Sequence, residues 1–199
     1  HTATAAKIHG VTLEEVSPEL RFSAKEVNIG VLYGMGSFGL ANRTGISQKQ
    51  AKQFIENYFQ SFSGVKKYLD DVIKKTKKDG YSHTLFGRRR YIPELTSKNA
   101  MIRKEADLMV INMPVQGTQA DIIKLAMIAV EKELLEKGWL QDNSVNMLLQ
   151  VHDELIFEVQ EKMVDEVSET IQKRMESVAM LAVPILVGIK TGKNWGSLE

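Results

Sequence analysis

Two adjacent carboxylates and a histidine, Asp153, Glu154 and His152, interrupt two apolar stretches in the segment LLQVHDELIFEV. The flanks VNMLLQV and LIFEV predict two strands joined at this charged bend. Their apolar character indicates a buried hairpin, where charge is costly unless a cation or a proton compensates it. Carboxylate oxygens bind divalent cations, which in phosphoryl transfer activate the attacking oxygen and stabilise the leaving one. Asp153 and Glu154 are therefore candidate metal ligands.

A polar turn is the alternative interpretation of this bend, because Asp is common in turns. A plain turn between two strands would more often use Asn-Gly or Asp-Gly. The role of His152 stays open as well, because a lone histidine is more often structural than catalytic.

Four residues at intervals of four, Arg21, Lys25, Ile29 and Tyr33, lie in the segment ELRFSAKEVNIGVLYG, which predicts a helix. Successive members lie about 40° apart round a helix, so they form one stripe. The cations could neutralise phosphate oxygens, the aliphatic chain could pack on sugar and base, and the ring could stack on a base. The stripe suits a nucleoside triphosphate. Spacing alone equally allows a solvated Arg/Lys pair beside ordinary core residues.

Positive charge is concentrated in one further stretch of the chain. Its members are Lys74, Lys75, Lys77, Lys78, Arg88, Arg89 and Arg90. Contacts from such residues to phosphates would bind nucleic acid without reading its sequence. The lysines are better interpreted as a solvated helix face, whereas the arginines beside Tyr91 favour a nucleic-acid contact.

The segment NMPVQGT places two amides, Asn112 and Gln116, in a kinked junction around Pro114. Amides can donate to the minor-groove acceptors that all correct base pairs share. The alternative is that they satisfy backbone groups exposed at a helix break.

Composition limits the classes of protein that the chain can belong to. The 199 residues are 43% hydrophobic, enough for a core in one or two domains, and the net charge is only +1. Any basic surface must therefore be local. The absence of cysteine excludes disulfides, thiolate metal sites and cysteine nucleophiles. No apolar run is long enough to span a bilayer and no signal peptide is visible, so we expect no membrane partner.

The elements that must position these residues follow from periodicity and from Gly and Pro. The opening residues HTATAAKIHG are typical of the middle of a helix, and the glycines of GMGSFG predict a loop or hinge. Thr118 and Asp121 resemble a capping box, and Gly138 is expected to close the helix after them. The predicted elements are helices from Pro18 to about Gly34, from Ser47, over 64–78, over 101–111 up to Pro114, over 118–137 and over 162–181; a hairpin turning near Gly87; and strands over 145–151, 155–159 and 184–190.

This order predicts an α+β fold in which a helical lobe is attached to an incomplete antiparallel lobe. The sequence motifs, taken in their order along the chain, resemble those of the A-family DNA polymerases, of the bacterial DNA polymerase I type. RFSAKEVNIGVLYG is similar to the fingers-helix motif of that family, and LLQVHDELIFEV to its palm carboxylate motif. TLFGRRRYIPEL and NMPVQGTQADIIKLAM also match family segments, and the resemblance covers essentially the whole chain.

The resemblance implies a right-hand polymerase, with helical fingers over residues 1–112 and the C-terminal part of the antiparallel-sheet palm over 113–199. Residues 1–17 would border the palm. It implies that Arg21 and Lys25 bind the dNTP triphosphate, with Lys25 also a catalytic proton donor to pyrophosphate. Tyr33 would guard the templating base, and His1 would face the triphosphate.

The same resemblance implies two Mg²⁺ ions held by Asp153, the catalytic carboxylate, with Glu154 assisting. Primer–template DNA would be bound by Gln116, His152, Asn112, Arg88 and Arg89. Ile29, the remaining dNTP-binding residue, stands where the family usually has Phe or Tyr against the sugar, which leaves sugar selectivity open. Phe22 occupies a position that is often basic.

The first palm motif of the family, with the other catalytic aspartate, would lie just upstream of His1. We therefore expect this chain to be processed, cut or partial. It is expected to be inactive until an upstream palm and thumb segment joins it, in cis or as a separate chain. The expected reaction is template-directed transfer of a nucleotide from a dNTP to a primer 3′-hydroxyl, in the cytoplasm of a bacterial or phage-infected cell, or in an organelle. A non-catalytic nucleic-acid-binding module is the alternative, and a metal-dependent phosphohydrolase is a third interpretation.

Overall fold

The computed structural model describes residues 1–198, and the side chains of all of these except residues 7–9 and 26. The chain forms two compact units, His1–Val115 and Gln116–Glu199. Helices and two separate antiparallel two-stranded sheets make up the fold, which confirms the predicted α+β class. The interpretation of the two parts as fingers and palm stays a prediction.

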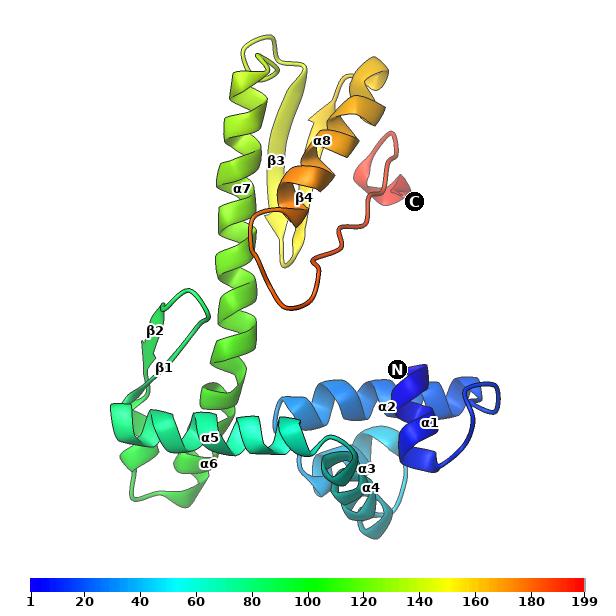
Figure 1. Cartoon of the computed structure of the whole chain (residues 1–199), viewed down its shortest axis with the longest axis vertical. Helices are drawn as coiled ribbons and strands as arrows, with labels where there is room; N and C mark the ends of the chain where they lie inside the picture. The colour runs from blue at the N-terminus through cyan, green and yellow to red at the C-terminus, as the bar shows by residue number, and fades with distance from the viewer. Residues whose placement is uncertain (199) are drawn as a thin grey trace. The chain divides into compact units, whose positions relative to one another are not determined.

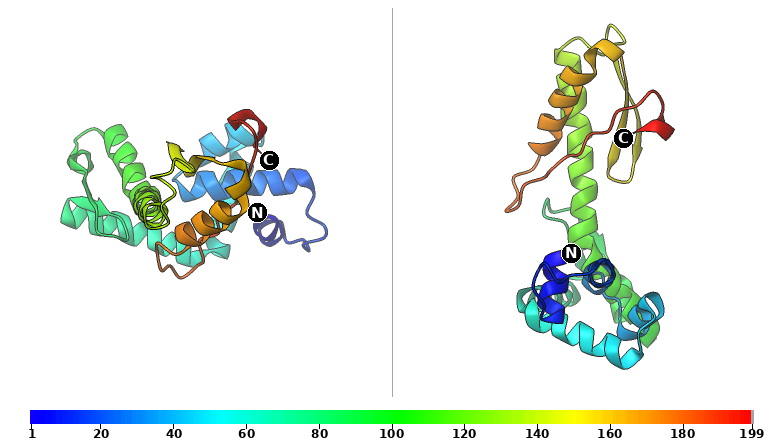
Figure 2. Two further views of the ribbon diagram at one scale, coloured as in Figure 1. Left: turned by 90° about the horizontal axis from the view of Figure 1, so that it is seen from above. Right: turned by 90° about the vertical axis from the view of Figure 1, so that its right-hand side faces the viewer.

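The first unit is helical apart from one small hairpin (Figure 1). Figure 2 shows α1 lying beside α2. In chain order its elements are α1 (Thr2–His9), α2 (Pro18–Leu32), α3 (Ser37–Thr44), α4 (Gln48–Ser61), α5 (Ser63–Asp79), β1 (Tyr81–His83), β2 (Arg89–Tyr91), the 3-10 helix η1 (Pro93–Thr96) and α6 (Ala100–Asn112).

Two apolar clusters hold this unit together. Val27 and Val31 of α2 pack with Leu40 of α3 and Tyr58 of α4. Ile92, Leu95, Ala106 and Val110 form the second cluster, around α6 and the segment before it. Each cluster fixes one helix that carries predicted site residues, α2 in the first case and α6 in the second.

Local signals predicted several helix ends correctly. Ser47 caps α4, because its hydroxyl accepts from Gln50 N at 3.3 Å while Ser47 N donates to Gln50 Oε1 at 2.9 Å. The expected loop GMGSFG is shorter than predicted, since α3 already begins at Ser37. Gly34 makes the turn with φ +84°, and a side chain there would meet Leu108 of α6.

The second unit places two helices beside a hairpin (Figure 1). Val130 and Leu134 of α7 and Val167 and Ile171 of α8 form its core with Val145 of β3. Its elements are the π-helical turn η2, which begins at Met113 in the first unit (Met113–Gly117), α7 (Thr118–Glu136), β3 (Val145–Val151), β4 (Glu154–Val159), the 3-10 helix η3 (Glu161–Met163), α8 (Val164–Glu176) and the 3-10 helix η4 (Trp195–Ser197).

The helix predicted over 101–111 ends before Pro114 as expected, because α6 stops at Asn112 and the wide π-helical turn η2 accommodates the proline. The predicted N-cap of α7 was wrong. Thr118 does not cap α7, because the backbone arrives at Gly117 already helical (φ −65°, ψ −38°). Gly138 ends the helix as predicted, with φ +78°.

The predicted strand over 184–190 is not present in the described chain. A strand needs a neighbouring backbone, and here the segment contacts the side chains of α8 instead: Gln172 Nε2 donates to Val187 O at 2.7 Å, and Val187 N donates to Glu176 Oε1 at 2.9 Å. The helix expected over 162–181 is also shorter, because α8 ends at Glu176.

Candidate functional site

The helix α2 carries the predicted stripe on its exposed side. Ser17 caps the helix by accepting from Leu20 N at 3.3 Å, and Pro18 occupies its first position. Because Ala24, Val27 and Val31 are buried against the lobe, Arg21 and Lys25 lie exposed on another face, with Ile29 43% exposed beside them. Two cations and an apolar side chain therefore do form one accessible surface.

Tyr33 lies just beyond the stripe rather than within the helix. It is the residue that ends α2, its backbone N donates to Ile29 O at 3.2 Å, and its side chain is half-buried. Tyr33 thus continues the spacing of four, but it lies at the C-terminal end of α2, next to the turn at Gly34.

His1 is brought to this surface by a residue that the sequence analysis missed. Asn28 Nδ2 lies 3.1 Å from His1 Nδ1 and donates to Thr4 Oγ1 at 2.9 Å, so Asn28 connects α1 to α2. An amide side chain is unfavourable inside a helix unless it has a hydrogen-bond partner, so an Asn within this predicted helix could have indicated a contact with another segment. His1 therefore lies beside the helix that carries Arg21 and Lys25, whose cations could bind phosphates.

The carboxylate hairpin has the predicted strands and a two-residue turn. Val151 pairs with Glu154, so His152 and Asp153 form its tip. His152 has φ +53°, a region that non-glycine residues rarely adopt, and its carbonyl accepts from Gln150 Nε2 at 2.6 Å. Two-residue turns more often place Gly or Asn at such a position, and the choice between a functional tip and a polar turn stays a prediction.

The expectation that this bend is buried was wrong. His152, Asp153 and Glu154 are all exposed, as are Leu148 and Leu149 of β3. Leu148 is the extra residue of a β-bulge in β3, between the pairs formed by Met147 and Leu149. Helices α7 and α8 cover only the half of the hairpin nearest Val145. The apolar sequence of the strands therefore does not imply burial at their tip.

The chemistry of Asp153 and Glu154 fits a hard divalent cation, but the number of ligands is small. Both side chains are exposed carboxylates, the ligand type that Mg²⁺ prefers. Among residues 1–198, no group of three or more His, Asp or Glu side chains is placed to hold a metal ion. The hairpin can therefore supply part of a metal site.

The predicted DNA-binding amides lie around the π-helical turn. Asn112 is the last residue of α6, and its Oδ1 is buried without a hydrogen-bond partner in the described chain. Gln116 lies within η2 and is exposed. π-Helical turns occur often at functional sites, and this one makes Gln116 accessible to a ligand.

The arginine triplet does not act as one group. Arg88 and Arg89 are exposed, and the Arg89 guanidinium lies over the Tyr81 ring, 4.6 Å from its centre. Arg90 instead contacts α6, with Nη2 3.5 Å from Met109 Sδ. The four lysines of the predicted basic stretch lie in α5 and are all exposed, which agrees with the interpretation of a solvated helix face, and Lys77 in addition pairs with Asp107 of α6 at 3.1 Å.

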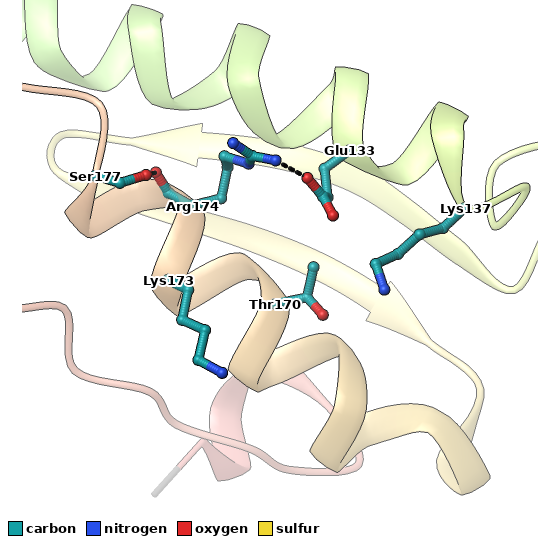
Figure 3. A pocket seen from close by; sticks show the side chains of 6 residues that line it. All are labelled: Glu133, Lys137, Thr170, Lys173, Arg174 and Ser177. Carbon is teal, nitrogen blue, oxygen red and sulfur yellow. Dashed lines mark hydrogen bonds and ion pairs between the residues drawn. The ribbon is translucent and has the colours of Figure 1, made fainter.

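A pocket of about 280 Å³ lies between α7 and α8 and contains none of the predicted site residues (Figure 3). Its lining residues are Glu133, Lys137, Thr170, Lys173, Arg174 and Ser177. Figure 3 shows Arg174 directed at Glu133, with which it forms an ion pair. The hydrogen bond from Arg174 lowers the pKa of the Glu133 carboxyl below its usual value.

This ion pair predicts a pH dependence of stability. A carboxyl whose pKa is lowered in the folded chain stabilises it above the unfolded value of roughly 4.3, and the effect disappears as pH falls through the lowered pKa. We expect Glu133→Gln to lower the melting temperature at pH 7, and this difference to shrink as pH falls below roughly 4.3 toward the lowered pKa. Calorimetry over this pH range measures the difference, with Glu131→Gln, which changes an exposed glutamate of α7, as the control. A Glu133→Gln deficit that persists undiminished at low pH would contradict the assignment.

Comparisons with known proteins identify the class of protein to which this fold belongs. The model of DNA polymerase family A matches residues 1–197. The chain is 45% identical over 197 residues to DNA polymerase I of Pseudomonas aeruginosa, covering 98% of this chain and 21% of the relative. It is 44% identical over 199 residues to the thermostable DNA polymerase I of Thermus thermophilus, covering all of this chain and 23% of the relative.

A solved structure agrees with these sequence matches. The POL domain of Pol1 from M. smegmatis, in complex with DNA primer–template and dNTP, superposes with a TM-score of 0.86 at 42% identity. The superposition covers 92% of this chain and 32% of that one. The chain belongs to DNA polymerase family A, which confirms the family predicted from the motifs, and it spans about a fifth of the length of the two curated relatives.

Two further findings concern the source of the relatives and membrane-spanning helices. Both curated relatives are bacterial proteins. Among the described residues, no helix is both long and apolar enough to cross a membrane.

Proposed function

We propose that the chain takes part in template-directed DNA synthesis, the transfer of a nucleotide from a dNTP to a primer 3′-hydroxyl. The observation that carries this proposal is the match to a structure solved with primer–template and dNTP, at a TM-score of 0.86. In this assignment residues 1–112 are the fingers and residues 113–199 are the C-terminal part of the palm.

The exposed surface of α2 is assigned to the incoming nucleotide. Arg21 and Lys25 neutralise the triphosphate, and His1, held by Asn28, donates a further hydrogen bond to it. Ile29 packs against the sugar, and Tyr33 lies at the helix end toward the templating base. Lys25 also donates a proton to the departing pyrophosphate.

Asp153 and Glu154 are assigned to Mg²⁺, the ion that family A polymerases use. When bound, the metal lowers the pKa of the attacking hydroxyl and stabilises the charge of the leaving group. Asp153 lies at the exposed tip of the hairpin, where its carboxylate would be accessible to such an ion. Two carboxylates are fewer than a two-metal site needs, so we assign the remaining ligand, a second aspartate, to a palm and thumb segment that joins this chain.

Primer–template DNA is assigned to five polar and basic residues, of which all but the half-buried Asn112 are exposed. Gln116 and Asn112 contact the nascent duplex through its minor groove, and His152 contacts the primer end. Arg88 and Arg89 bind phosphates.

A hybrid polymerase tests this proposal. In it, the chain replaces the corresponding segment of the Pseudomonas aeruginosa relative, which is 45% identical. We expect magnesium-dependent primer extension by the hybrid and none by the isolated chain, since the latter supplies only part of a metal site. Calorimetry verifies that the hybrid is folded.

A non-catalytic nucleic-acid-binding module is the second candidate, favoured by the lack of any group of three metal-binding side chains in the described residues. A folded hybrid that binds primed DNA but does not extend it, while the parent relative does, would support this candidate and overturn the proposal.

A further inference from the structure

The small hairpin β1–β2 has two chemically different faces. Its register pairs Tyr81 with Tyr91, Ser82 with Arg90 and His83 with Arg89. Side chains of a strand alternate between its faces, so Ser82 and Arg90 share one face. This inner face contacts α6, because Ser82 Oγ donates to Val110 O at 3.2 Å and Arg90 contacts Met109.

The outer face carries the other four side chains, Tyr81, His83, Arg89 and Tyr91. The rings of Tyr81 and Tyr91 lie 5.6 Å apart, and the Arg89 guanidinium covers the Tyr81 ring at 4.6 Å. His83 Nε2 lies 3.4 Å from Lys75 Nζ. Tyr91 is 68% exposed, so a large aromatic surface faces solvent. We call these four residues the aromatic platform.

The rest of the hairpin has the same character. None of the residues 81–91 is acidic, whereas three are arginines. At the turn, Leu85 and Phe86 are exposed as well. A face with flat rings, a planar cation and no negative charge matches a ligand that offers both aromatic faces and phosphates.

We propose that the aromatic platform binds an unpaired strand of DNA, with a base stacked on Tyr91 and phosphates at Arg89 and Arg88. In a duplex the base faces are covered by neighbouring bases, so exposed rings contribute little to duplex binding. Unpaired bases have free faces that stack on aromatic side chains, with little preference for sequence. This inference rests on the proposed function only in taking DNA as the ligand, and it assigns the unpaired template to the hairpin.

The test compares two substitutions of one ring. Tyr91→Leu keeps apolar bulk but removes the ring, whereas Tyr91→Phe keeps the ring. We expect Tyr91→Leu to weaken binding of a fluorescent oligo(dT) about five- to tenfold, at the low end for base stacking. The affinity of Tyr91→Phe for oligo(dT) should stay within about twofold of that of the parent chain. The affinity of both variants for a blunt duplex should also stay within about twofold of the parent value. Fluorescence anisotropy at fixed salt measures all of these.

A matched control is Tyr68→Leu, an exposed tyrosine on α5 that belongs to no part of the platform. Circular dichroism and the melting temperature verify that each variant is folded. An equal loss for oligo(dT) and duplex, no loss with Tyr91→Leu, or a similar loss with Tyr68→Leu would overturn the proposal. The measurement uses no dNTP, metal ion or primer extension. Its outcome therefore tests the aromatic platform even if the proposed polymerase function is wrong.

Discussion

Replacement of Asp153 by Asn is expected to lower the rate of primer extension by the hybrid polymerase about a thousandfold or more. Asn keeps the size of the side chain but removes the negative charge that binds a metal ion. Metal-ion stabilisation of the transition state is worth several kcal/mol, and about 1.4 kcal/mol corresponds to a factor of ten in rate. Single-turnover kinetics with saturating dNTP and Mg²⁺ measure the change.

The same hairpin supplies a matched control. Glu158 is an exposed carboxylate on β4 with no assigned role, so Glu158→Gln should change the rate less than about twofold. Binding of primed DNA should be retained in both variants, because Asp153 is assigned to the metal. An Asp153→Asn hybrid that extends primers at the parent rate would show that this carboxylate binds no catalytic ion.

Substitution of Lys25 separates two roles of one side chain. Lys25→Gln removes both charge and proton, and we expect weaker dNTP binding together with a rate about a hundredfold lower. Lys25→Arg keeps the charge, so dNTP affinity should stay within about threefold. Its rate should still fall at least about tenfold, because a guanidinium does not release a proton in proteins. Single-turnover rates over a range of dNTP concentration give both quantities.

Lys49, exposed on α4, provides the control for this pair of variants. Lys49→Gln removes a lysine charge from the same lobe, and we expect affinity and rate close to the parent values. If Lys25→Arg is as fast as the parent, Lys25 contributes charge alone and the proton donor must be sought elsewhere.

Local signals in the sequence were sufficient for most helices. Ser47 and Gln50 form the cap that starts α4, and Gly138 takes the left-handed conformation that ends α7. These features depend on residues three or four positions apart, which is the range over which capping and turn preferences operate. The carboxylate hairpin was also predictable, because two apolar stretches flank a two-residue turn.

The errors concern features that depend on more distant partners. Residues 184–190 have the composition of a strand, but strand formation needs a second backbone, and the described chain offers only α8 side chains there. The bend at Asp153 has apolar flanks, but hydrophobicity shows which side chains favour burial and not which element covers them.

In the candidate site, too, local patterns were predictable and contacts between distant residues were not. Periodicity alone placed Arg21, Lys25 and Ile29 on one surface, and the structure confirms that they share it. The contact of Asn28 with His1 joins residues 27 positions apart, which no local pattern encodes. The sequence indicated a nucleic-acid contact at the arginines beside Tyr91, but not that Tyr81 and Arg89 share its face, because that depends on the strand register and on the packing of the hairpin against α6.

The left-handed backbone of His152 has a consequence for protein engineering. Glycine adopts this conformation without the steric cost of about 1 kcal/mol that a side chain incurs. Random mutagenesis screened only for survival after heating would therefore enrich glycine at the tip of the hairpin, at the expense of the contact assigned to the primer end. A screen that selects for heat resistance and for DNA synthesis in alternate rounds would retain the histidine. Position 152 is thus one where robustness and activity favour different amino acids.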